Sequence, residues 1–150
     1  MKIFIGADHR GVEFKSKIKD ILKKLGYSVE DLGTDSSEGC DYPVIAQKVS
    51  DSVVKTKDAR GILVCNSGIG QSMAANKVNG ILAALCYNTE AAKLSRLHNN
   101  ANVLVLSAMF VNPNDLEDIL KIWLNTAFEG GRHERRIKLI EDIEDGKRLY

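Results

Sequence analysis

The residues best suited to chemistry lie in one short segment, Cys65-Asn-Ser-Gly-Ile-Gly70. It follows an apolar run and precedes a helical pattern, which indicates a glycine-rich turn between a strand and a helix. Unpaired backbone N–H groups at a helix start bind anions, and the same setting favours a thiolate over a thiol. The segment therefore predicts a reactive sulfur at Cys65 beside donors for a developing negative charge. It is neither a Walker A loop nor a full GxGxxG dinucleotide fingerprint.

Polar residues at other predicted strand ends could join this turn. Asp8 and His9 follow the first apolar run, and His98 and Asn99 stand just before the last one. Each also has a structural interpretation, Asp8 as a helix cap and His98 as part of a polar helix terminus. The chain has three histidines, and two of them fall at the rim of the predicted sheet. They show no HxH, HxxxH or HExxH spacing, so we expect no metal site.

Two arginines and a tyrosine complete the candidates. Arg132 and Arg136 are four residues apart, which places both guanidinium groups on one helix face, where they could grip a phosphate or a carboxylate. A solvated face with salt bridges is the alternative. Tyr42 precedes Pro43 in a loop, where its ring could pack or its hydroxyl could position a substrate.

Short apolar runs alternate with longer amphipathic ones along the chain. Strands are predicted over 2–6, 27–32, 62–65, 81–86 and 103–106, and helices over 12–25, 43–56, 69–77, 88–97, 113–128 and 132–143. The strands are apolar rather than alternating, as strands covered on both faces are. This pattern predicts a three-layer α/β/α sandwich on a five-stranded parallel sheet, with ligands bound beyond the carboxyl ends of the strands.

Composition excludes several classes of protein. A length of 150 residues suits one domain over 1–150, and a net charge of +1 gives no general attraction to nucleic acid or membrane. Three cysteines without a CxxC pair argue against a disulfide framework or zinc site and fit a reducing cytoplasm. We expect no signal peptide and no membrane span.

Six segments together resemble the type B ribose-5-phosphate isomerases, the family that also holds the bacterial galactose-6-phosphate isomerase subunits. They keep the family's order and spacing from residue 3 to the C-terminus. The segments are Gly6-Ala-Asp-His-Arg-Gly11, Asp41-Tyr-Pro43, Cys65-Asn-Ser-Gly-Ile-Gly70, Ala74-Ala-Asn-Lys77, Leu94-Ser-Arg-Leu-His-Asn-Asn-Ala-Asn-Val103 and Glu129-Gly-Gly-Arg-His-Glu-Arg-Arg136.

The resemblance implies a Rossmann-like fold and an aldose–ketose isomerase that interconverts ribose 5-phosphate and ribulose 5-phosphate without metal or organic cofactor. It also implies a homodimer or homotetramer with the active site between subunits, and a C-terminal helix, over about 132–150, that packs on a partner subunit. A helix start beside Cys65 should lower the pKa of this base.

The resemblance also assigns a role to each candidate residue. Cys65 would move the proton between sugar carbons, and Ser67 would assist proton movement among the sugar oxygens. Asp8 and His98 would help to open the sugar ring. Those expected to bind or orient the substrate are His9, Tyr42, Asn66, Gly68, Gly70, Asn99, Arg132 and Arg136.

Four positions depart from the family pattern. Asn66 replaces a frequent glycine, which restricts the turn unless Asn66 adopts an unusual backbone angle. Gln71 stands where one branch of the family has a glutamate base, so this chain resembles the cysteine branch. Met109 stands where many members have a phosphate-binding arginine, and Arg10 could compensate for that loss.

Two other functions remain open at this stage. The same chemistry on a six-carbon phosphate, such as allose or galactose 6-phosphate, is the nearer alternative. A sugar-phosphate-binding module without catalysis is the more distant one. A thiol-redox role has no resolving cysteine near Cys65 in sequence.

Overall fold

Five short segments form one parallel sheet in the computed structural model, which describes residues 1–150. The order β2-β1-β3-β5-β4 is parallel at every pairing, so all carboxyl ends share one edge of the sheet, the carboxyl edge. The amino ends share the opposite edge, the amino edge. The strands are β1 (Lys2–Ala7), β2 (Ser28–Asp31), β3 (Arg60–Cys65), β4 (Ala83–Leu85) and β5 (Val103–Ser107).

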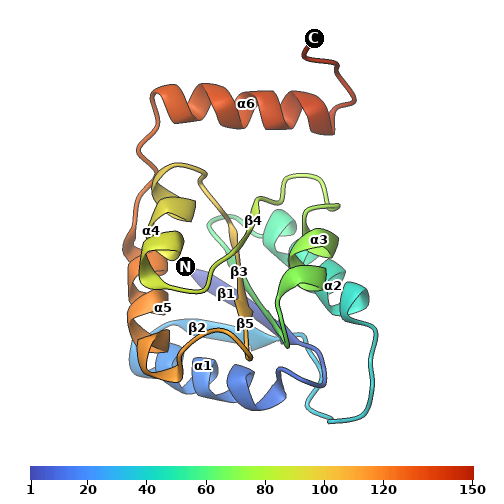
Figure 1. The fold of residues 1–150 in the computed structure, drawn as a ribbon, viewed down its shortest axis with the longest axis vertical. Coiled ribbons are helices and arrows are strands. Elements are labelled where there is room, and N and C mark those ends of the chain that lie inside the picture. The colour runs from blue at the N-terminus through green and yellow to red at the C-terminus, as the bar shows by residue number, and fades with distance from the viewer.

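Helices cover both faces of this sheet (Figure 1). One face carries α1 (Val12–Lys24), α4 (Thr89–Leu97) and α5 (Leu116–Asn125), and the other carries α2 (Tyr42–Lys55) and α3 (Ile69–Ala75). Two separate buried clusters result, because the sheet divides the apolar side chains of the two helix layers. Trp123 is fully buried in the first cluster and Val49 in the second. The predicted three-layer α/β/α fold is confirmed.

The last helix, α6 (Arg132–Glu144), lies apart from these layers, across one end of the molecule (Figure 1). Ile137 is its main apolar anchor, and the Glu144 carboxylate accepts hydrogen bonds from Gly80 N at 2.9 and 3.0 Å. Ile140 and Ile143 on the same helix remain exposed. No helix of the structure combines the length and apolar character that a membrane crossing requires.

The element boundaries differ from the predicted ones mainly at helix ends. The helix predicted over 113–128 is a short 3₁₀ turn, η1 (Pro113–Asp115), followed by α5, and the chain turns extended at Thr126. The C-terminal helix ends at Glu144, close to the residue 143 that the pattern predicts and short of the residue 150 that the resemblance implies, because Gly146 adopts φ 79° and closes the last turn onto Ile143 O.

Candidate active site

Cys65 is the last residue of β3 and is 6% exposed. Gly68 N donates a hydrogen bond to its Sγ at 3.1 Å. Gly68 has φ +83°, and a Cβ there would lie 2.4 Å from Leu85 Cδ1, so both the backbone angle and the space require glycine. The chain therefore bends back over the sulfur before α3 begins, as the glycine spacing predicts.

The expected lowering of the Cys65 pKa is wrong for this chain by itself. Burial raises the pKa of the thiol, and the negative charge of Asp8 raises it further. The backbone N–H groups of Gly68, Gln71 and Ser67 lower it, which is the contribution that a helix start should make. Desolvation outweighs these donors, so Cys65 is an uncharged thiol at neutral pH in the isolated chain.

Asp8, His9 and Tyr42 gather with Cys65 at the carboxyl edge. The buried Asp8 accepts hydrogen bonds from Arg10 N and Gly11 N at 3.0 and 3.1 Å, which fixes its carboxylate at the start of α1. His9 Nδ1 accepts a hydrogen bond from Cys40 N at 3.4 Å. The Tyr42 ring lies directly over Gly70, where an added Cβ would come within 2.6 Å of Tyr42 Cζ.

The turn accommodates its departures from the family pattern. Asn66 does not adopt a positive φ, and its carbonyl accepts hydrogen bonds from Ser107 Oγ at 2.6 Å and Met109 N at 3.0 Å. The glycine that the family often has at position 66 is therefore not needed here, because the backbone angle is one that asparagine adopts without strain. Ser67 Oγ accepts a hydrogen bond from Ile69 N at 3.3 Å. Gln71 is fully buried and donates from Nε2 to Val64 O at 3.4 Å.

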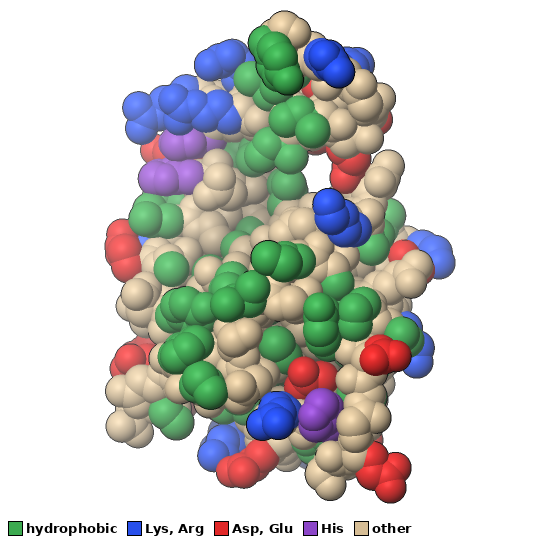
Figure 2. Space-filling view, turned by 45° about the vertical axis from the view of Figure 1, so that its right-hand side comes forward, with side chains coloured by type: hydrophobic (Ala, Val, Ile, Leu, Met, Phe, Trp, Pro, Cys, Tyr) green, Lys and Arg blue, Asp and Glu red, His purple; other side chains and the backbone are tan.

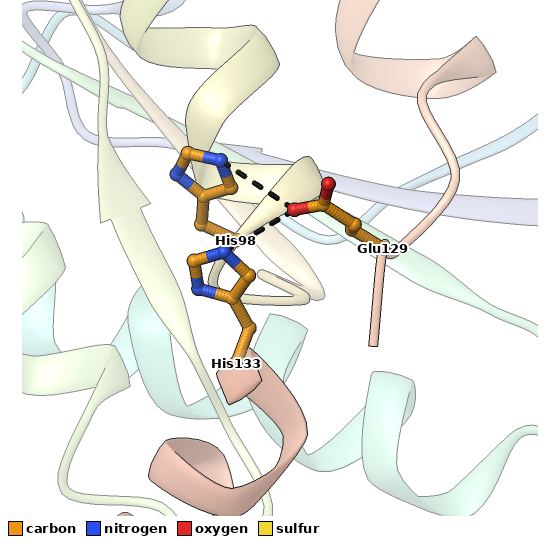
Figure 3. Close-up of side chains that lie close together, drawn as sticks. All are labelled: His98, Glu129 and His133. Carbon is orange, nitrogen blue, oxygen red and sulfur yellow. Dashed lines mark ion pairs between the residues drawn. The ribbon is translucent and has the colours of Figure 1, made fainter. Parts of the chain in front are cut away.

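A second group of candidates lies around the end of α4 and the start of α6 (Figure 3). His98 and His133 stack with ring centroids 4.2 Å apart and planes 8° from parallel. Glu129 Oε2 lies 3.2 Å from His133 Nε2 and 3.8 Å from His98 Nε2. The sequence pointed to His98 but not to Glu129 or His133, although their i,i+4 spacing was a signal. The charged residues around His133 predict a surface position for it, and this prediction is wrong, because His133 is buried.

Burial, the neighbouring His98 and the Arg132 charge lower the pKa of His133, while the Glu129 charge raises it. Arg132 and Arg136 both lie exposed at the start of α6. With His98, Asn99, Glu129 and His133 they form what we call the histidine–arginine group.

The two groups lie at opposite edges of the sheet. Cys65 pairs with Ser107 at the carboxyl edge, whereas the loop after His98 leads to Asn102 O, which accepts from Gly61 N at the amino edge. The β5 strand between them spans about 13 Å at ~3.3 Å per residue. In Figure 2 two histidine side chains lie together beside basic side chains at the α6 end, and the third lies at the other end. The expectation that His9 and His98 share one rim is wrong, because His98 precedes its strand.

Glu129, His98 and His133 are the only three such side chains whose potential metal-ligand atoms lie within 4.8 Å of one another. Their present geometry does not suit a shared ion. A metal binds imidazole in the plane of the ring, and two nearly parallel rings with centroids 4.2 Å apart direct their lone pairs in different planes. One ring would have to rotate before both could bind. A metal-free site stays a prediction.

A family model described as ribose/galactose isomerase matches residues 3–140. The chain belongs to this family. The resemblance seen in the six segments is thereby confirmed, and it extends over nearly the whole chain.

Relatives in this family match this chain over nearly their full length. The ribose-5-phosphate isomerase B of Escherichia coli is 42% identical over 143 residues, which are 95% of this chain and 96% of that protein. A structure of ribose-5-phosphate isomerase B from Clostridium thermocellum superposes with a TM-score of 0.94 at 47% identity, covering 97% of this chain and 99% of that one. The enzyme from Mycoplasma genitalium, solved with bound ribulose-5-phosphate, gives 0.92 at 44% identity, with 97% of each chain covered.

The raised pKa of Cys65 has a direct chemical consequence. Because only the thiolate reacts with iodoacetamide, we expect the alkylation rate of Cys65 to rise with pH with a midpoint above that of a cysteine in a short peptide with blocked ends. The measurement is mass spectrometry of the Cys65 peptide over a pH series, in a Cys40→Ser background that removes the more exposed thiol. A midpoint below that of the reference thiol, with the same value in an Arg132→Ala/Arg136→Ala background, would show that the N–H donors outweigh the burial of the sulfur.

Proposed function

We propose that this chain interconverts ribose 5-phosphate and ribulose 5-phosphate by moving a proton between C2 and C1 of the open-chain sugar. The observation that carries the proposal is the Cys65 sulfur, held among backbone N–H donors at the carboxyl edge of a chain of this isomerase family. Relatives that match nearly the whole chain are named ribose-5-phosphate isomerase B, and one of them was solved with bound ribulose-5-phosphate.

The chemistry follows from what each group can do. The Cys65 thiolate takes the proton from C2 of the aldose, and the electron pair of that C–H bond forms the C1–C2 double bond of an enediolate. The carbonyl electrons move onto oxygen, where N–H donors of Asn66 and Gly70 stabilise the charge, at ~3 kcal/mol for a well-placed donor. Gly68 N, which donates to Cys65 Sγ, joins them as the sulfur takes up the proton and becomes a weaker acceptor. Ser67 passes a proton between the two oxygens, and the Cys65 thiol returns its proton to C1 to give the ketose.

We propose that a second copy of this chain completes the site. The roles given to His98, Asn99, Arg132 and Arg136 require contact with the same sugar as Cys65, yet within one chain they lie at the opposite edge of the sheet. A homodimer, alone or within a homotetramer, removes the conflict when the histidine–arginine group of one copy faces the carboxyl edge of the other. Ring opening then uses Asp8 of one chain and the partner's His98.

The surface around the Cys65 turn supports such an interface. Ile69, Met73 and Phe110 are exposed there, and Phe110 makes an edge-to-face contact with Tyr87, whose hydroxyl donates to Ser67 O at 3.3 Å. Hydrophobic side chains also gather across the middle of the face in Figure 2. Contiguous exposed apolar surface of this kind is typical of interfaces. The C-terminal helix α6, with Ile140 and Ile143 exposed, is the second apolar surface proposed to pack on a partner.

Assembly would also correct the protonation state of the base. Two guanidinium groups of the partner, beside the substrate phosphate and Cys65, would favour the thiolate and offset part of the desolvation that raises its pKa. His9 is proposed to bind the same phosphate. Arg10 is a further candidate, because it lines a hollow of about 290 Å³ with Asn66 and Ala108, next to the position of Met109.

A substrate comparison in heavy water tests the proposed reaction. We expect turnover and deuterium exchange at the carbon-bound position with ribose 5-phosphate, and at least about tenfold lower kcat/KM with allose 6-phosphate and galactose 6-phosphate. A preference for a six-carbon phosphate would keep the chemistry and change the substrate. Phosphosugar binding without exchange on any of the three would leave only a binding module. A cytoplasmic location, which the three free cysteines favour, is part of the proposal.

A further inference from the structure

A cavity of about 450 Å³ opens at the amino edge, opposite to Cys65. Residues just before four of the parallel strands line it, and α6 closes one side through Ile137 and Glu141. Ligand sites of parallel sheets normally lie at the carboxyl edge, so the proposed isomerase site leaves this cavity unexplained. Its lining comes from Met1, Asp58, Ala59, Arg60, Gly80, Leu82, Arg96, Asn100, Asn102, Ile137 and Glu141.

Two arginines without a carboxylate partner define the chemistry of this cavity. Arg96 is 7% exposed, and its guanidinium donates to Thr126 O, Ala101 O and Asn100 Oδ1. Arg60 donates through Nη1 to two carbonyl oxygens at the end of α5. Neither makes an ion pair, and Arg60 is close enough to lower the pKa of Arg96, which burial and this repulsion bring to about 10. Each guanidinium keeps donors, Nη2 among them, that no protein group accepts.

A buried guanidinium group, that of Arg96, and a half-buried one, that of Arg60, repel each other and would be stabilised by a shared anion. A phosphate bridges two such groups well, because its oxygens match the planar fork of an arginine. Two carboxylates, Asp58 and Glu141, also line the cavity but make no ion pair with either arginine. They can accept hydrogen bonds from hydroxyl groups. The volume lies within the range of small-molecule sites and exceeds what a phosphate ion alone would fill.

We propose that the amino-edge cavity is a second binding site, separate from the isomerase site, for a small hydroxylated phosphomonoester whose phosphate bridges Arg60 and Arg96. The loop at Asn100 connects it to the histidine–arginine group. Asn100 lines the cavity and accepts from Arg96 Nη1 at 3.0 Å, and it follows directly after His98 and Asn99. An occupant of the cavity therefore contacts the same loop that carries two proposed active-site residues.

Asn100→Asp is a mild way to test the site. Asn100 has φ 49°, a left-handed conformation that aspartate also tolerates, and an aspartate keeps the acceptor for Arg96. The new carboxylate would form an ion pair with the Arg96 guanidinium and would repel a phosphate, so we expect it to weaken phosphate binding at this site at least about tenfold. Asn114→Asp adds the same charge at an exposed position and serves as the matched control. Arg60→Met provides a second variant that removes a ligand donor.

The measurement is calorimetric titration of the assembled protein with inorganic phosphate and with glycerol 3-phosphate, in the wild type and in the Arg132→Ala/Arg136→Ala variant. We expect one site to remain in that double variant, to bind glycerol 3-phosphate more tightly than phosphate, and to be lost in Asn100→Asp and Arg60→Met but not in Asn114→Asp. Equal affinity for the two probes would exclude a phosphomonoester ligand. Binding unchanged in Asn100→Asp would overturn the site, whatever the Arg132→Ala/Arg136→Ala variant does to isomerisation.

Discussion

Cys65→Ala should lower kcat for isomerisation by about 10³-fold, within the range found when a general base is removed. The proposed proton transfer depends on one atom, Cys65 Sγ, and no other titratable side chain takes its place in the turn: Gln71, which stands at the glutamate position of the other branch, cannot act as a base. The measurement is initial rate together with deuterium exchange at the carbon-bound position, since loss of the base removes both.

The control for this variant is Cys86→Ala, which removes a thiol of similar burial elsewhere in the core. Both substitutions delete one buried sulfur and should cost comparable stability, about 1 kcal/mol. A thermal melt of the two variants separates a loss of folding from a loss of chemistry. Wild-type turnover in Cys65→Ala would show that the sulfur is not the base.

The sheet and its layers could be predicted from apolar runs because the three central strands, β1, β3 and β5, are short and buried. The Ile62–Cys65 run and the Gly68 turn specify a strand that bends sharply before a helix, and the structure has both. The two edge strands are the exceptions, because each has a neighbour on one side only: the residues of β2 alternate between exposed and half-buried, and those of β4 are all half-buried.

Two properties of the candidate site could not be predicted from the sequence, because they depend on contacts between residues far apart in the chain. The pKa of Cys65 rises because tertiary packing removes water from the sulfur, which a local pattern of glycines does not reveal. The contact of Glu129 with His98 joins a loop after α5 to the end of α4. The edge of the sheet at which His98 lies could have been predicted. His98 precedes β5 and Cys65 ends the neighbouring parallel strand β3, so the two residues must lie at opposite edges.

The position of Cys65 and of the histidine–arginine group at opposite edges of the sheet predicts complementation between two inactive variants. If each site uses Cys65 of one chain and arginines of the other, then Cys65→Ala and Arg132→Ala/Arg136→Ala are inactive alone but complement each other when mixed. In a mixed dimer one site has both lesions and the other has none. Random pairing of equal amounts gives about half mixed dimers, so the mixture should recover about a quarter of wild-type activity. The substituted arginines are exposed, so the variant should fold normally.

The matched control mixes Cys65→Ala with Asp8→Ala, whose lesions lie in the same group at the carboxyl edge. Every site of that mixed dimer contains one of the two lesions, so no activity should return. The assay is isomerisation after subunit exchange or co-expression, with differently tagged chains to count mixed dimers. Recovery in the first mixture only would establish that the site is shared between chains. Failure of the first mixture to recover, with mixed dimers present, would mean that each chain folds its arginines onto its own Cys65, which the parallel register of β3 and β5 opposes.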